Sequence, residues 1–118
     1  MEKSRRFPRT EMVLRVDFRI SGQKENREKT FTQIVGGGGL MATTPSLLPA
    51  GTIVDMNLYH DSFVIPFEAQ VVWVDPAEKT DTREYKCGFQ FITGSNSGLM
   101  HIQYLVQSKL NDQISNLP

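Results

Sequence analysis

Three arginines lie close together near the start of the chain, in the stretch Ser4-Arg5-Arg6-Phe7-Pro8-Arg9-Thr10. A guanidinium group can fork onto a phosphate or onto the O6 and N7 edge of guanine, and its flat face can stack on a base. Two arginines four positions apart, Arg5 and Arg9, therefore suit a guanine nucleotide. The alternative is that terminal basic residues only keep a neutral protein in solution, and spacing alone does not exclude it.

A run of four glycines, residues 36–39, is the second stretch that could meet an anion, because glycines after a strand expose backbone N–H groups. A nucleotide-triphosphatase loop would continue with Gly-Lys-Ser/Thr, and a dinucleotide fold would continue with a helix. The chain instead continues Leu40-Met41-Ala42-Thr43-Thr44-Pro45, so both enzyme classes are excluded. Two interpretations remain: a backbone site for a ligand, or a bulge at a corner of a barrel.

The other reactive side chains give no constellation for catalysis. His60 and His101 are far apart in the sequence and have no neighbours at metal-ligand spacing, so no metal or catalytic role is expected. The alternation of the strands predicts Cys87 and Trp73 as core residues, although Trp73 could stack on a base. No pair of nucleophile and base is present, and we expect no enzyme and no cofactor.

Composition limits the partners. The chain has 118 residues, which fits one domain. Its 13 basic and 13 acidic side chains give no net charge that would attract it to duplex nucleic acid or to an anionic membrane. The single cysteine cannot form an internal disulfide, and no apolar run reaches the roughly 20 residues of a membrane helix. We expect a cytoplasmic protein without membrane insertion.

Hydrophobic periodicity predicts a β-rich domain. Alternation indicates strands at residues 13–20, 30–35, 52–59, 63–74 and 85–91, with a short strand at 40–43 and an edge or bulge at Pro66. After Gly94 the apolar residues recur at helical spacing. The pattern favours a small antiparallel barrel closed by one carboxy-terminal helix. The expected parts are a flexible arginine arm (1–10), the barrel (13–92) and the helix (95–114).

The order and spacing of these motifs resemble the PilZ domain over nearly the whole chain. The residues that carry the resemblance are Arg5-Arg6-Phe7-Pro8-Arg9, the glycine turn running into Leu40, Val71-Val72-Trp73-Val74, and Gly88-Phe89-Gln90-Phe91 before the last helix. The resemblance implies a six-stranded antiparallel PilZ-type β-barrel with a C-terminal α-helix. It also implies a bacterial receptor for the second messenger cyclic di-GMP, which acts by changing contacts with a protein partner.

In the family, an Arg-x-x-x-Arg arm and an Asp/Asn-x-Ser-x-x-Gly turn hold the ligand. Arg5 and Arg9 match the arm, with Arg6 beside them, but the turn departs from the pattern in either register. Read from Gln33, its three positions are Gln33, Val35 and Gly38; read back from Leu40, they are Ile34, Gly36 and Gly39. Losing two hydrogen bonds to charged groups would cost about 3 to 6 kcal/mol, or roughly two to four decades of affinity.

The resemblance leaves two functions open. In the first, the chain binds cyclic di-GMP and relays the signal to an unknown protein partner. The expected ligand residues are Arg5, Arg6, Arg9, Gln33, Val35, Gly36, Gly38 and Gly39. In this case Gln33 replaces the amide, and the extra glycine lets backbone N–H groups approach a phosphate. In the second, a degenerate PilZ domain binds no nucleotide and serves as a protein-interaction adaptor in motility or pilus function. Self-association through residues 99–114 is a further alternative.

Overall fold

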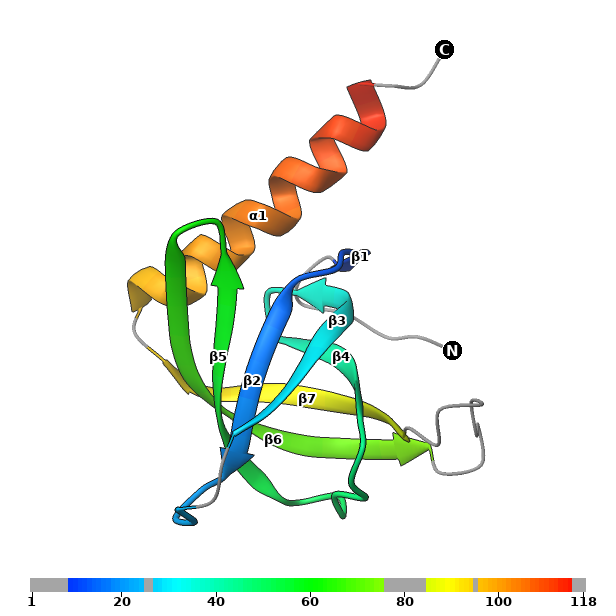
Figure 1. Ribbon diagram of the computed structural model, residues 1–118. Coiled ribbons are helices and arrows are strands. Elements are labelled where there is room, and N and C mark those ends of the chain that lie inside the picture. The colour runs from blue at the N-terminus through cyan, green and yellow to red at the C-terminus, as the bar shows by residue number, and fades with distance from the viewer. Residues whose placement is uncertain (1–8, 25–26, 76–84, 95, 116–118) are drawn as a thin grey trace.

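The structure is a computed structural model of the chain, and it describes residues 9–24, 27–75, 85–94 and 96–115. Seven strands precede one helix (Figure 1). The elements are β1 (Arg9–Glu11), β2 (Arg15–Ile20), β3 (Glu28–Gly36), β4 (Gly39–Thr44), β5 (Ile53–His60), β6 (Phe63–Asp75), β7 (Tyr85–Gly94) and α1 (Asn96–Ser115).

Six of the strands close into an antiparallel barrel, which confirms the predicted fold class. The strand order is β3-β2-β5-β6-β7-β4, and β4 pairs back onto β3 to complete the ring. The short strand β1 pairs with the end of β3 outside this ring, with Arg9 opposite Gly36. The last residues of the expected arm, Arg9 and Thr10, therefore lie in β1, and residues 1–8 lie outside the described part of the chain.

The barrel interior is filled by the apolar residues of the alternating strands. Val16 and Phe18 of β2 and Val54 and Leu58 of β5 are fully buried, as period-two alternation predicts for strands with one face inward. Cys87 is also fully buried, which confirms its predicted place in the core. Burial raises the pKa of its thiol, and a contact with the Thr44 hydroxyl opposes that shift only in part.

Helix α1 lies across one end of the barrel. Its buried side chains are Ile102, Leu105 and Val106, and the helix contacts β1, β3 and β6. Figure 1 shows that the second half of the helix extends away from the barrel. In the described residues, no helix combines the length and apolar character that crossing a membrane requires.

The pairing of β6 with β7 is irregular at two points, and the first lies between Glu68 and Ala69. Pro66 pairs with Asn57 of β5 and lies just before the pairing with β7, which begins at Phe67. A second irregularity lies between Val71 and Trp73, where the register with β7 shifts. The prediction that Trp73 faces the core is therefore wrong: the shift turns its indole outward, and the residue is 44% exposed.

Candidate functional site

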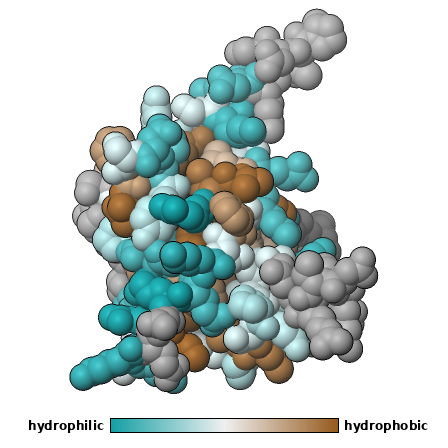
Figure 2. Space-filling model, in the orientation of Figure 1, coloured by the Kyte–Doolittle hydropathy of each residue, from teal (hydrophilic) through white to brown (hydrophobic). Residues whose placement is uncertain are grey.

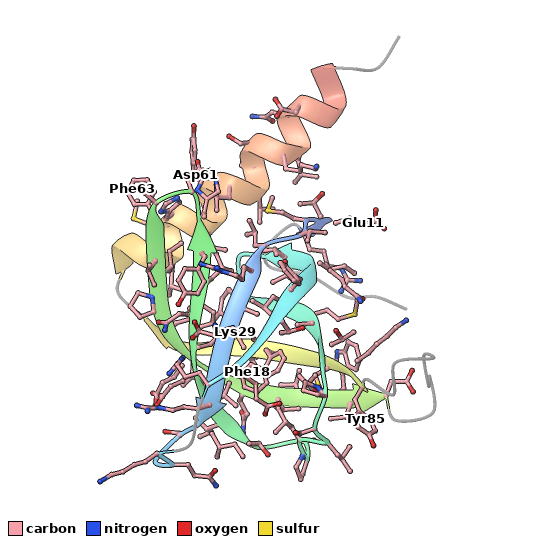
Figure 3. All side chains as sticks on the ribbon, viewed as in Figure 1. Glu11, Phe18, Lys29, Asp61, Phe63 and Tyr85 are labelled. Atoms are coloured by element: carbon pink, nitrogen blue, oxygen red, sulfur yellow. The ribbon has the colours of Figure 1, made fainter. Side chains whose placement is uncertain are left out.

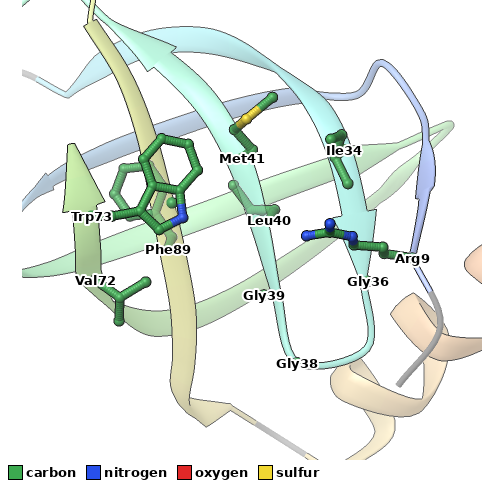
Figure 4. A pocket seen from close by; sticks show the side chains of 11 residues that line it. Arg9, Ile34, Gly36, Gly38, Gly39, Leu40, Met41, Val72, Trp73 and Phe89 are labelled. Carbon is green, nitrogen blue, oxygen red and sulfur yellow. The ribbon is translucent and has the colours of Figure 1, made fainter. Parts of the chain in front are cut away.

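A pocket of about 250 Å³ lies beside the glycine turn, where β1, β3, β4, β6 and β7 come together (Figure 4). Its lining is mostly apolar or glycine, and Arg9 supplies the only charged side chain among the lining residues. They are Arg9, Ile34, Gly36, Gly38, Gly39, Leu40, Met41, Val72, Trp73, Gly88 and Phe89. Such a pocket combines an apolar wall with one cation, which suits a flat ring that carries an anionic group.

Arg9 is held at the pocket by the pairing of β1 with β3. Because Arg9 lies opposite Gly36, its exposed side chain crosses β3 near Gly36 and points toward β4 (Figure 4). A guanidinium in this position can donate to a phosphate or to a guanine edge. Arg5 and Arg6, the other two arginines of the predicted clamp, lie outside the described residues.

At least one glycine of the turn, Gly39, is required by close packing and not by an unusual dihedral angle. Gly36 and Gly39 are not among the described glycines with positive φ, which are Gly22 and Gly51. A Cβ atom on Gly39 would lie 2.2 Å from the carbonyl oxygen of Phe89, so the backbones of β4 and β7 approach each other here. Across the same edge, the Phe91 N–H group donates to the Gly38 carbonyl at 3.0 Å.

The structure separates the two registers in which the turn can be aligned with the family motif. Ile34, Gly36 and Gly39, the residues of the register counted back from Leu40, all line the pocket. In the other register, Val35 is fully buried in the core, and the exposed Gln33 is absent from the lining. The pairing of β3 with β4 shifts register between Thr32 and Ile34, at the start of this segment. The pocket therefore brings together Arg9, Gly36, Gly38 and Gly39, and it does not include Gln33 or Val35.

Trp73 and Gly88 form a wall of the pocket that sequence reasoning missed. They lie opposite each other on β6 and β7, and a Cβ atom on Gly88 would be 2.1 Å from Nε1 of the indole. The indole thus lies directly against the Gly88 backbone, and Trp73 remains 44% exposed, so part of its ring is accessible to a base. The available signal was Gly88 itself, because a glycine inside a strand often marks a close approach.

The two histidines lie together, away from this pocket. Their rings are 5.4 Å apart in an edge-to-face contact, and Phe63 lies 5.1 Å from His101 on the other side. Figure 3 shows Asp61 and Phe63 at the tip of the β5–β6 hairpin, next to α1. No group of three or more metal-ligating side chains occurs among the described residues. The contact explains how the hairpin holds the start of the helix.

Comparison with solved structures shows the same fold in several proteins. The inhibitor of motility MotI/DgrA of Bacillus subtilis aligns with a TM-score of 0.75 and 18% identity, over 99% of this chain and 55% of that one. The PilZ domain of YcgR from Escherichia coli, solved with c-di-GMP, has a TM-score of 0.70 and 13% identity, over 98% of this chain and 100% of that domain. This chain thus spans about half of the Bacillus protein but all of the Escherichia domain.

A third structure is MrkH, described as a c-di-GMP-dependent transcription regulatory factor. It aligns with a TM-score of 0.65 and 16% identity, over 97% of this chain and 52% of that one. No curated protein matches the sequence. At these identities the structures show the fold alone. The sequence itself matches the model of the PilZ domain over residues 3–108, which is most of the chain. The family is one of ligand-binding regulatory domains, and no catalytic family is indicated. The chain belongs to the PilZ domain family.

Proposed function

We propose that the chain is a cytoplasmic bacterial receptor for cyclic di-GMP that relays the signal to a protein partner. The observation that carries the proposal is the pocket itself, which places Arg9 beside a close-packed glycine turn and opposite an exposed tryptophan. The Arg9 guanidinium can donate to a phosphate or to the edge of a guanine, and the Trp73 indole can stack on the face of a base. The relatives solved with cyclic di-GMP support the choice of ligand.

The mechanism we propose is closure of the arm over the pocket. β1 joins the pocket to the residues that precede it, because Arg9 begins the strand and pairs with Gly36. Arg5 and Arg6 precede Arg9 by four and three positions, so the three guanidinium groups lie close enough along the chain to bind the phosphates and guanines of one ligand together. Because β1 also contacts α1, closure of the arm would change the surface that these two elements present to a partner.

The polar side chains of the family turn must be replaced for this function. In the register that faces the pocket, Ile34 stands at the Asp/Asn position and Gly36 at the Ser position. We propose that backbone N–H groups of residues 36–39 serve in place of the serine hydroxyl, since glycines let a phosphate approach the backbone. Trp73 adds a stacking contact, which is worth about 1 to 3 kcal/mol per base.

Calorimetric titration of cyclic di-GMP into the wild type tests the proposal, with the Arg9→Ala and Arg5→Ala/Arg9→Ala variants alongside. We expect saturable binding that weakens at least tenfold in Arg9→Ala and is lost in the double variant, because each lost charged hydrogen bond is worth about 1.5 to 3 kcal/mol. Arg19→Ala, on the outer face of β2, is the matched control. Trp73 is the only tryptophan, so its fluorescence gives an independent reading of the same site.

The second candidate function is an adaptor that binds no nucleotide. The specific observation in its favour is that the lining residues at the family's acidic and serine positions, Ile34 and Gly36, carry no polar side-chain group. If wild type and variants are folded and none gives heat or a fluorescence change with cyclic di-GMP, the receptor proposal is wrong and the adaptor function is preferred.

A further inference from the structure

The outer face of the barrel carries a set of exposed apolar side chains away from the pocket. Outward side chains of four strands stand in one row, because Phe31 pairs with Arg15, Arg15 with Tyr59, and Tyr59 with Val64. Phe31 is 57% exposed and Val64 is 52% exposed, and Val13, two residues before Arg15, is 72% exposed. We call Val13, Arg15, Phe31, Tyr59 and Val64 the outer-face patch. Figure 2 shows hydrophobic side chains gathered below α1 on this face, with hydrophilic ones beneath them.

The Arg15 guanidinium in this patch is held in place by its neighbours. The guanidinium carbon of Arg15 lies 4.4 Å from the centre of the Tyr59 ring. The Tyr59 hydroxyl in turn donates to the Asp17 carboxylate, which also accepts from Asn57 at 3.1 Å and from Arg27. Because Tyr59 is fixed at its hydroxyl, Arg15 is ordered before any partner arrives, which lowers the entropy lost on binding.

The charge of the patch selects its partner. Within the described part of the chain, no ion pair joins a carboxylate to Arg15 or to the neighbouring exposed Lys29, whereas the cations Arg19 and Arg27 are paired with Asp55 and Asp17. A carboxylate of a partner would therefore find an unpaired guanidinium on an aromatic ring, flanked by apolar side chains. Arginine and aromatic residues of this kind are enriched at the centres of protein interfaces.

An anionic membrane fits this face less well. Besides the four basic side chains Arg15, Arg19, Arg27 and Lys29, it carries three carboxylates, those of Asp17, Asp55 and Glu68. A net formal charge of one gives only about 1 kcal/mol of attraction to an anionic surface. The alternation of charges instead matches a protein surface of mixed polarity.

We propose that the outer-face patch docks a segment of a partner protein that carries an Asp or Glu side chain between aromatic or branched aliphatic residues. The carboxylate forks onto Arg15, and the apolar side chains of the segment cover Phe31, Val64 and Val13. The patch shares β3 and β6 with the pocket, but its residues are different and the docking does not require cyclic di-GMP.

The test is selection of a displayed random peptide library on the immobilised wild-type chain without nucleotide, so that its outcome is independent of ligand binding. We expect selected peptides to carry an acidic residue beside aromatic or aliphatic ones. A synthetic consensus peptide should bind at least tenfold more weakly to Arg15→Gln and to Phe31→Ser, with Arg15→Lys in between because lysine cannot fork onto a carboxylate. The matched controls Arg19→Gln and Leu47→Ser, both outside the patch, should bind within twofold of wild type.

Several results would overturn the proposal. They are failure to select a consensus, selected peptides without acidic residues, and a consensus that binds the patch variants as tightly as the wild type. Dimerisation of the wild type in sedimentation equilibrium that Phe31→Ser abolishes would assign the patch to a second copy of the chain. Co-sedimentation with anionic phosphatidylserine vesicles that Arg15→Gln abolishes would assign it to a membrane. Circular dichroism of each variant verifies that the exposed substitutions leave the fold intact.

Discussion

The pocket beside the glycine turn and the outer face around Asp17 lie on one barrel but are built from different groups. In the pocket, four glycines contribute backbone to the lining, and the exposed indole of Trp73 lies across β4 from Arg9. Around Asp17, side chains bind one another: the carboxylate is only 10% exposed and accepts from Tyr59, Asn57 and Arg27. The pocket leaves its guanidinium and indole groups available to a ligand, whereas the polar groups of the Asp17 cluster form hydrogen bonds with one another.

This difference indicates what each region can contribute. A site made of backbone and one cation gains its remaining hydrogen bonds from a ligand, so substitutions of its open side chains should change affinity more than stability, whereas its close-packed glycines also matter for stability. A satisfied polar cluster contributes to stability and to the orientation of Arg15, since an unpaired member would bear the full cost of desolvation. The predictions below test this division.

The largest effect is expected from restoring the family's turn motif in the register that faces the pocket. The double variant Ile34→Asp/Gly36→Ser places a carboxylate and a hydroxyl at two lining positions. Two added hydrogen bonds to charged groups, worth about 3 kcal/mol together at the low end, should raise the affinity for cyclic di-GMP about 100-fold. Titration of the variant against the wild type measures the gain.

The matched control places the same groups in the other register, as Gln33→Asp/Val35→Ser. Val35 is fully buried, so its replacement by serine should lower stability without improving binding. Equal gains from both double variants, or a gain from the control alone, would contradict the proposal that the register lining the pocket is the one that binds the ligand.

Effects of similar size or smaller, on stability, are expected from the two glycines that permit close contact. The added methyl of Gly39→Ala meets the Phe89 carbonyl oxygen at 2.2 Å, and backbone on both strands must move, at a cost of about 3 kcal/mol. The added methyl of Gly88→Ala meets only the exposed indole of Trp73, which can swing away, so about 1 kcal/mol is expected. Urea unfolding compares the two, and a larger loss for Gly88→Ala would contradict the assignment.

The fold could be predicted from the sequence because most strands keep strict alternation. Val16 and Phe18, or Val54 and Leu58, are buried where period two places them, and the change to helical spacing after Gly94 marks α1. Prediction failed at Trp73, where an irregularity in the β6–β7 pairing reverses the direction of the side chain. Periodicity assumes an unbroken ladder, so one bulge moves a residue from core to surface.

The pocket was predictable only in part, for a related reason. Arg9 and the glycine run stood out as residue types, but the choice between registers depends on a shift between Thr32 and Ile34 that no local pattern reveals. Tertiary pairing alone brings Trp73 across from Gly88. The Asp17 cluster was missed entirely, because Arg27 lies between the predicted strands 13–20 and 30–35, and Asn57 and Tyr59 are about forty residues from Asp17.

The effects expected around Asp17 are distinguished by their dependence on pH. Burial alone would raise the pKa of the Asp17 carboxyl, but hydrogen bonds from Tyr59, Arg27 and Asn57 outweigh it, so that pKa lies below its ordinary value of 3.8. Because folding depresses this pKa, the stabilisation is complete above about pH 4 to 5 and is lost as the pH falls through the folded-state value. At pH 7, Asp17→Asn should therefore cost about 2 kcal/mol, measured by urea unfolding.

Two graded controls separate the carboxylate cluster from simple surface charge. Tyr59→Phe removes one donor to Asp17 but keeps the ring beneath Arg15, so it should cost only about 1 kcal/mol and raise the pKa of Asp17. Asp55→Asn removes a more exposed carboxylate that lies 4.0 Å from Arg19, and less than about 1 kcal/mol is expected. The difference between Asp17→Asn and wild type should shrink as the pH is lowered to 3, since the wild type then begins to lose the same charge. A difference that stays constant from pH 7 to pH 3 would mean that Asp17 acts through shape and neutral hydrogen bonds, and that its charge contributes nothing to the stability of this face.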